Sequence, residues 1–178
     1  MASMNLKFVS LNLFSKKLVS IDLSENKIRS LPEEFVTIAP LQLLKIDNNL
    51  LSALPKDFWK LSKLRKLIAS HNSIEELPPK FEWLFNLDCL QIDDNMIKRL
   101  PEKLGLLTNL TKLHLHENRL ACLPRELSKL SNLTDFSLEW FMYTKPANSR
   151  TTKNPDVIKS IRDFCQNFQF QPVNNTTP

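Results

Sequence analysis

The chain has three histidines, His71, His114 and His116, and His116 is its best candidate for chemistry. His116 lies 23 residues after Asp93 and 23 residues before Glu139. If that interval brings the three side chains together, an imidazole between two carboxylates could bind zinc or transfer protons. Carboxylate neighbours also favour the charged imidazole, so contacts made by His116 would be sensitive to pH.

The same interval of 23 residues governs most of the chain. Asparagines recur at this step, and so do the Leu-Pro pairs at 31–32, 54–55, 77–78, 100–101 and 123–124; the asparagines are Asn26, Asn49, Asn72, Asn95 and Asn118. A fixed period between about 20 and 50 residues indicates stacked supersecondary units. From residue 41 the unit reads Leu41-x-x-Leu44-x-Ile46-x-x-Asn49-x-Leu51-x-x-Leu54-Pro55-x-x-Phe58-x-x-Leu61.

Each unit is predicted to contain a short strand and one helical turn. The Leu-x-x-Leu-x-Leu phase alternates between inward and outward side chains, as a half-buried strand does. Apolar residues three apart, such as Phe58 and Leu61, suit a helical or 3₁₀ turn that packs inward. The asparagine side chain both donates and accepts hydrogen bonds, so we expect the stacked asparagines to satisfy backbone groups where the chain leaves the strand. They are predicted to be structural residues.

This motif, which extends over about residues 8–165, resembles that of leucine-rich repeat proteins. The 23-residue step, with Asn followed by x-hydrophobic-x-x-Leu-Pro, is similar to the intracellular subclass that includes Ras suppressor and related GTPase-pathway scaffolds. The resemblance implies a curved solenoid of α/β class, with a parallel sheet on its concave face and short helical or 3₁₀ turns on its convex face. It also implies that the concave face binds other proteins. The shared motif positions belong to the scaffold and carry no binding residues to this chain.

The repeats are predicted over residues 18–138, as five full units and one partial unit. Residues 1–17 do not fit the unit, and the connection to the first repeat is too short for a parallel crossover, so we expect an antiparallel strand that caps the sheet. Residues 139–168 are predicted to form an aromatic and helical cap, with Asn154-Pro155 at the start of its helix. Residues 169–178 lack an apolar pattern and are predicted to be a mobile tail.

Composition and the remaining motifs limit the possible functions. With 178 residues, 42% of them hydrophobic, and a single glycine, Gly105, the chain fits one continuously ordered domain. It shows no secretory signal and no membrane-spanning stretch, and its three scattered cysteines favour reduced thiols, so we expect a cytoplasmic protein with no membrane partner. A phosphate-binding loop, metal-ligand spacing and a nucleophile elbow are all missing from the sequence. We therefore expect no enzyme, no cofactor and no metal.

The variable outward positions of each strand are expected to select the partner, because structural needs do not explain their residues. The predicted partner-binding residues are Leu43, Lys45, Ile68, His71, Gln91, Asp93, Asp94, His114, His116, Glu117, Glu139 and Trp140. Apolar residues rimmed by charge are typical of protein interfaces, and Trp140 is the expected hot spot. The alternative interpretation is a solvated face with incidental Leu and Ile.

Charge on these outward positions favours a protein partner over nucleic acid. They hold eight acids and three lysines, although the whole chain carries a formal net charge of +5. A protein that binds nucleic acid is expected to gather basic and aromatic residues on the sheet instead. We therefore predict a monomeric, non-catalytic adaptor or scaffold whose partner presents a basic and partly apolar segment. The alternative is a structural subunit of a larger intracellular assembly, held by its basic convex face as well.

Overall fold

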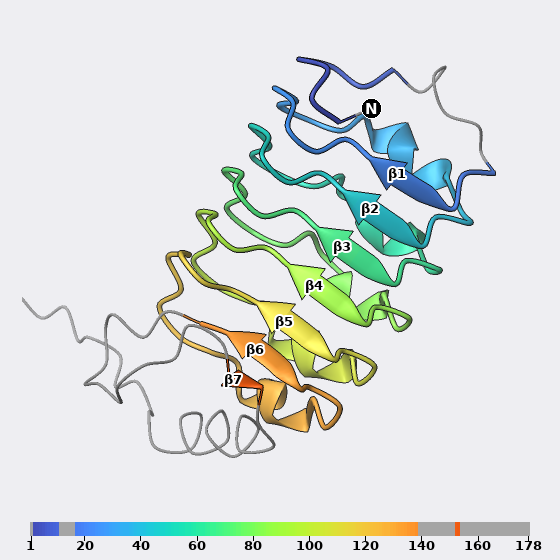
Figure 1. Ribbon diagram of the computed structural model, residues 1–178. Helices are drawn as coiled ribbons and strands as arrows, with labels where there is room; N and C mark the ends of the chain where they lie inside the picture. Colours follow the sequence, from blue (N-terminus) through green and yellow to red (C-terminus); the bar gives the residue numbers. More distant parts are fainter. Residues whose placement is uncertain (1, 11–16, 139–151, 154–178) are drawn as a thin grey trace, which may run out of the picture.

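The computed structural model is a solenoid of stacked repeats, and it describes residues 2–10, 17–138 and 152–153 (Figure 1). Six parallel strands of three residues each lie side by side in chain order: β1 (Ser20–Asp22), β2 (Leu43–Lys45), β3 (Lys66–Ile68), β4 (Cys89–Gln91), β5 (Lys112–His114) and β6 (Asp135–Ser137). Paired residues are one repeat apart throughout, from Ser20 with Leu43 to Lys112 with Asp135. The predicted parallel sheet and its solenoid class are confirmed.

Within the described residues, five short 3₁₀ helices form the convex side: η2 (Glu33–Thr37), η3 (Phe58–Lys60), η4 (Phe81–Trp83), η5 (Glu102–Leu106) and η6 (Arg125–Lys129). Each ends where a backbone N–H donates to the carbonyl three residues earlier, as Leu84 does to Phe81. The apolar pairs predicted to face inward are buried in every repeat. The rings of Phe58 and Phe81 stack with their centroids 6.3 Å apart. Inward packing of one large residue per turn therefore holds the convex side to the sheet.

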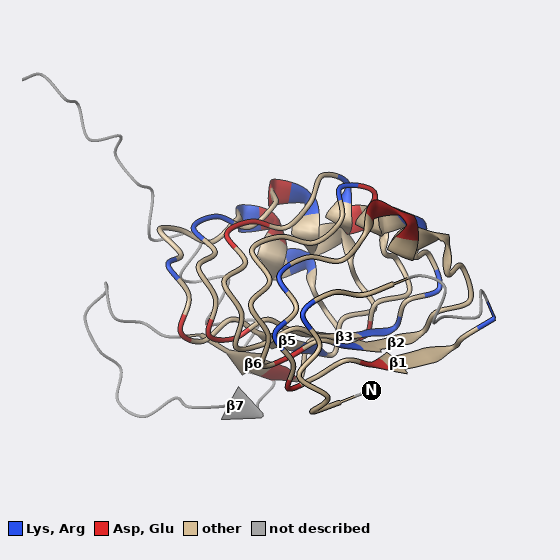
Figure 2. Cartoon of the chain, turned by 90° about the horizontal axis from the view of Figure 1, so that it is seen from above, with Lys and Arg blue, Asp and Glu red and all other residues tan. Residues whose placement is uncertain are grey.

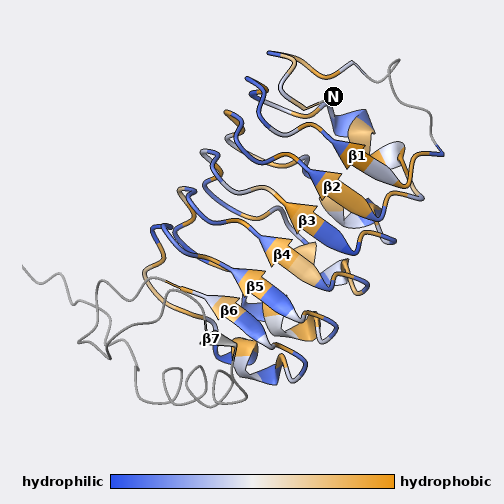
Figure 3. Ribbon diagram, viewed as in Figure 1, coloured by the Kyte–Doolittle hydropathy of each residue, from blue (hydrophilic) through white to orange (hydrophobic). Residues whose placement is uncertain are grey.

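The hydrophobic core lies between the sheet and these turns. The middle residue of each strand points into it, and none of the six is more than 5% exposed: Ile21, Leu44, Leu67, Leu90, Leu113 and Phe136. Figure 3 shows hydrophobic residues recurring at the same place in successive strands. Burying one such side chain contributes about 1.5–3 kcal/mol, so a period that repeats the same apolar positions builds a continuous core.

The asparagine ladder has the structural role that the sequence predicts. The Asn49 side-chain amide donates to the carbonyls of Leu23, Ile46 and Asp47, at 2.9, 3.1 and 3.1 Å. Its Oδ1 accepts the backbone N–H of Ile28, in the preceding repeat, at 3.0 Å. Asn72, Asn95 and Asn118 repeat this pattern. Each asparagine therefore ties its own turn to the repeat before it.

The N-terminal segment takes the place of a preceding repeat. Asn26 Oδ1 accepts the backbone N–H groups of Met4 and Leu6, at 3.1 and 2.9 Å, and Lys27 N–H donates to the Leu6 carbonyl. Residues 2–10 contain no strand, and residues 11–16 lie outside the described part of the chain. The segment thus closes the first repeat through the turn beside Asn26, and the cap strand expected in residues 1–17 stays a prediction.

At the other end of the sheet, β7 (Thr152–Lys153) pairs antiparallel with β6. The helical cap predicted for residues 139–168 lies outside the described residues apart from this strand, and so does the predicted tail at 169–178.

Candidate functional site

One row of outward side chains crosses the middle of the concave sheet. The strand register pairs Lys45 with Ile68, Ile68 with Gln91, and Gln91 with His114. All four are half-buried. Leu43, two residues before Lys45 on β2, is half-buried as well. The structure therefore brings five of the predicted binding residues together on β2–β5. Side chains directly opposite one another on paired strands are close enough to interact, and Gln91 Nε2 lies 3.2 Å from His114 Nδ1.

His114 is the imidazole that the structure places between two carboxylates. Its Nε2 lies 3.0 Å from Asp135 Oδ1, and its Nδ1 lies 3.7 Å from Asp93 Oδ2. Lys112 Nζ contacts Asp135 Oδ2 at 2.7 Å, and the side chains of His114 and Asp135 are each 14% exposed. This network occupies β5, β6 and the loop after β4.

The predicted place of His116 between two carboxylates stays a prediction. His116 Nε2 lies 3.2 Å from Glu117 Oε1, and its backbone N–H donates to Asp93 Oδ1 at 2.9 Å. Glu139, the other expected neighbour, lies outside the described residues, as does Trp140.

The network shifts the pKa values of two of its members. Burial acts to raise the pKa of Asp135, but hydrogen bonds from Lys112 and His114 outweigh it and hold that pKa below its ordinary value. The hydrogen bond to Asp135 raises the pKa of Lys112, although burial opposes it. Both shifts favour the charged forms, so the cluster is a structural ion pair at neutral pH.

Cys89, on β4 two residues before Gln91, has a buried side chain. It is 8% exposed, and its Sγ lies 3.8 Å from Gln91 Oε1. Burial raises the pKa of its thiol. Since the thiolate is the nucleophile, this cysteine is poorly suited to covalent chemistry. Within residues 2–10, 17–138 and 152–153, no group of three His, Cys, Asp or Glu side chains is arranged to hold a metal ion.

The residue just before each ladder asparagine has a structural role that sequence reasoning missed. All five have positive φ angles between 48° and 55°: Glu25, Asn48, His71, Asp94 and Glu117. Left-handed backbone is tolerated best by glycine, Asn and Asp, so the turn restricts what these positions accept. The sequence did contain a signal for this turn: these residues always precede the ladder asparagine, and two of them, Asn48 and Asp94, are types that tolerate left-handed backbone. His71, Asp94 and Glu117 remain exposed, so they are still candidate contact residues.

Two acids on the concave face pair with lysines within the chain. Asp22 lies 3.9 Å from Lys45, and Asp135 lies 2.7 Å from Lys112. Figure 2 shows acidic and basic residues on both the sheet side and the turn side, so neither face carries one sign of charge alone. The acidic excess available to a partner is therefore smaller than the sequence suggests, and it lies in the loops that follow the strands.

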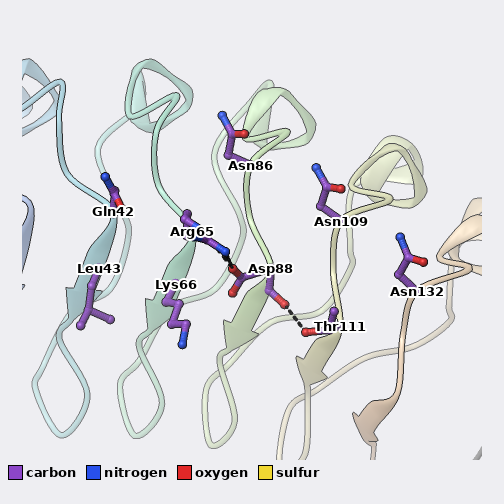
Figure 4. Close-up of a pocket in the computed structure, with 9 residues that line it drawn as sticks. All are labelled: Gln42, Leu43, Arg65, Lys66, Asn86, Asp88, Asn109, Thr111 and Asn132. Carbon is purple, nitrogen blue, oxygen red and sulfur yellow. Dashed lines mark hydrogen bonds and ion pairs between the residues drawn. The ribbon is translucent and has the colours of Figure 1, made fainter.

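A shallow groove runs along the other end of the strands, and sequence reasoning did not find it (Figure 4). Its lining comprises Gln42, Leu43, Arg65, Lys66, Asn86, Asp88, Asn109, Thr111 and Asn132. The three asparagines form a second ladder, in which each side-chain amide donates to the carbonyl 24 residues earlier at 2.7–2.8 Å. Arg65 and Asp88 are joined across adjacent repeats by an ion pair at 2.9 Å. The asparagines, Arg65 and Asp88 therefore already have partners within the chain, so we assign the groove to the scaffold.

Comparison with known proteins agrees with the repeated geometry. A family model described as "Leucine-rich repeat region" matches residues 41–169, and a model described as "Leucine Rich Repeat" matches residues 17–38. The chain belongs to the leucine-rich repeat family. Leucine-rich repeats generally form non-enzymatic folds that bind other proteins.

Solved leucine-rich repeat structures share the fold. A leucine-rich repeat protein of Leptospira interrogans is 31% identical, with a TM-score of 0.64 over 70% of this chain and 31% of that one. An internalin of Listeria monocytogenes is 27% identical, with a TM-score of 0.59 over 74% of this chain and 36% of that one. A third structure is the ectodomain of the Arabidopsis thaliana receptor kinase GASSHO1/SCHENGEN3, solved in complex with CASPARIAN STRIP INTEGRITY FACTOR 2. It is 30% identical, with a TM-score of 0.61 over 67% of this chain and 15% of that one.

The leucine-rich repeat chain described here spans about a third of the length of the first two of these proteins, and less of the third. No curated protein matches it. Among the residues that the structure describes, no helix has the length and apolar character needed to cross a bilayer.

Proposed function

We propose that this chain is a non-catalytic adaptor that binds a partner protein across its concave face. The observation that carries the proposal is the row of Lys45, Ile68, Gln91 and His114, which the strand register holds side by side with Leu43 next to it. Half-buried apolar groups among polar ones match the anatomy of a protein interface. The Arabidopsis relative, solved with a bound partner, shows that the same architecture can serve binding.

The chemistry of the face favours a partner segment that is basic and partly apolar. Asp94 and Glu117 are exposed in neighbouring loops beside this row, and Glu25 is exposed in the first loop. A segment with basic side chains opposite these loops and an apolar side chain over Ile68 and Leu43 would complement both features. A cytoplasmic location and a monomeric state when isolated are part of this proposal, as is a contact by Trp140.

The test is a crosslinking pull-down from lysate that compares two double variants of equal charge change. Asp94→Lys/Glu117→Lys alters the concave edge, and Glu33→Lys/Glu34→Lys makes the same kind of change on the convex turn η2, where both residues are exposed. Asp93 is left intact because it accepts hydrogen bonds from the His116 backbone and from Ser70. Circular dichroism first confirms that all the proteins fold.

We expect partners identified with the wild type to be lost at least about tenfold with the concave variant, and retained with the convex variant. Equal losses in the two variants would show that net charge, and not the concave face, governs capture. If the chain can be purified from its native source only as part of a larger complex, the alternative of a structural subunit is favoured.

A further inference from the structure

The convex face carries an exposed apolar cluster, here called the turn patch, made of Trp83, Phe85 and Leu106 with Trp59 beside them. Their exposed fractions are 45%, 55% and 44% for the first three, and Trp59 is half-buried. The two indoles meet edge to face with ring centroids 5.2 Å apart. The patch therefore lies on η3, η4 and η5 and just after η4, in the middle three of the five convex turns that the structure describes.

The other repeats show that the fold does not require these residues. The position of Trp83 and Leu106 is filled by Thr37, Lys60 and Lys129 in the remaining repeats. The position of Phe85 is filled by Ala39, Ser62, Thr108 and Ser131. Because the same backbone accepts small or polar side chains there, packing of the solenoid does not explain a tryptophan and a phenylalanine in water.

Lysines are frequent in the three segments that carry the turn patch. Over residues 56–63, 79–85 and 102–108 the chain has five lysines, all exposed: Lys56, Lys60, Lys63, Lys80 and Lys103. Of the three acids there, Glu82 is 9% exposed, and Asp57 forms an ion pair with Lys60 that cancels both charges. Four lysines and Glu102 remain. Lys80 Nζ lies 5.0 Å from the Trp59 ring and 5.2 Å from the Trp83 ring, within cation–π range. Aromatic and cationic groups thus form one surface.

We propose that the turn patch docks the solenoid onto an anionic lipid surface. Indole and phenyl rings reside favourably at the level of lipid headgroups, and each nearby lysine adds about 1 kcal/mol of attraction to anionic lipid. A flat bilayer also meets a convex face at its middle turns, where these residues project. An acidic protein or a second copy of this chain is the competing occupant. This site lies on the face opposite the proposed partner site, so the two can be tested separately.

The measurement is co-sedimentation of the full chain with lipid vesicles at low salt. One vesicle set is phosphatidylcholine alone, and the other contains about one third phosphatidylserine to supply negative surface charge. The patch variant replaces three apolar residues with residues that the fold already uses in the same positions: Trp83→Thr, Phe85→Ser and Leu106→Thr. Its matched control removes three exposed apolar residues elsewhere: Phe8→Ser, Val19→Thr and Leu50→Thr.

A second pair of variants separates the patch from the net charge. Lys63→Glu/Lys103→Glu reverses charge beside the patch, and Lys7→Glu/Lys27→Glu makes the same change at exposed lysines near the N-terminus. We expect the wild type and both controls to sediment with the phosphatidylserine vesicles, and the two patch-directed variants to bind at least about tenfold more weakly.

Other outcomes overturn the proposal. If the wild type stays in the supernatant with both vesicle sets, no lipid docking occurs. If the patch variant binds the vesicles as well as the wild type, the overall basic charge of the chain is sufficient for binding and the turn patch is not the docking site. If the wild type ignores vesicles but its mass by light scattering rises with concentration, and the patch variant stays small, the patch joins copies of the chain instead.

Discussion

The two faces of this solenoid handle their side chains differently. On the concave face, polar groups bind one another across adjacent strands, as His114 does with Gln91 and Asp135. On the middle convex turns, Trp83 and Phe85 project into solvent beside lysines. Polar side chains on the concave face thus find hydrogen-bond partners within the chain. The apolar side chains of the turn patch are left uncovered by the described residues.

This difference shows how a repeat protein separates scaffold from recognition. Positions that recur in every unit are held by burial and by the asparagine ladder, so they are interchangeable between repeats. Residues that break the recurrence, such as the turn-patch aromatics, report on something outside the scaffold. The predictions below test this separation, from the largest expected effect to the smallest.

Two phenylalanines four residues apart give the sharpest test. Phe81 is fully buried, whereas Phe85 is 55% exposed. We expect Phe81→Ala to lower the free energy of unfolding by about 3–5 kcal/mol, because it leaves a cavity under η4. Phe85→Ala should change it by less than about 0.5 kcal/mol. Urea denaturation measures both, and a comparable loss for Phe85→Ala would mean that the turn patch belongs to the scaffold.

The single glycine marks a close approach of two convex turns. A Cβ atom on Gly105 in η5 would overlap the backbone carbonyl of Glu126 in η6. We expect Gly105→Ala to destabilise the fold by about 2–3 kcal/mol, since backbone must move to admit the methyl group. Ser128→Ala, at the same position one repeat later, is the control and should cost less than about 1 kcal/mol. Equal midpoints in thermal denaturation would contradict this account of the glycine.

The two asparagine ladders should differ in strength. Asn95 is 6% exposed and bonds four backbone groups, whereas Asn109 is exposed and donates to the Phe85 carbonyl. We expect Asn95→Ala to lower the free energy of unfolding by about 2 kcal/mol, because it leaves buried backbone groups unpaired. Asn109→Ala should lower it by about 0.5 kcal/mol. Hydrogen exchange should also accelerate at the Ile74 amide in the first variant alone; protection there unchanged would refute the ladder's role.

The concave network predicts a weaker effect that depends on pH. The folded-state pKa of Asp135 lies below its ordinary value of 3.8, so its contribution to stability is present above that value and is lost as the pH falls through the folded-state pKa. The raised pKa of Lys112 places the corresponding loss above its ordinary value of 10.5. We expect Asp135→Asn to flatten the acid side of the stability profile, measured by urea denaturation between pH 6 and 3. Glu102→Gln, on the exposed turn η5, should leave the profile unchanged; a matching change there would assign the effect to overall charge.

Much of the fold could be predicted because a repeat of constant length is easy to count. The strands, the inward pairs such as Phe58 and Leu61, and the role of Asn49 all follow from the period and from alternating apolar residues. The candidate site was predicted in part. The row from Lys45 to His114 lies within the strands, where the register fixes neighbours. His116 lies past the end of its strand, and its place between Asp93 and Glu139 stays a prediction because Glu139 lies outside the described residues.

The sequence by itself determined which residues occupy equivalent positions, since the period counts covalent links and the core needs the same apolar residues in each unit. The tertiary structure decided what equivalent residues do. It placed the backbone before each asparagine in the left-handed region, buried the Cys89 thiol, and brought Lys80 onto two indoles from adjacent repeats. Such contacts depend on side-chain directions and on separations of a few ångströms, which a period of 23 residues does not encode.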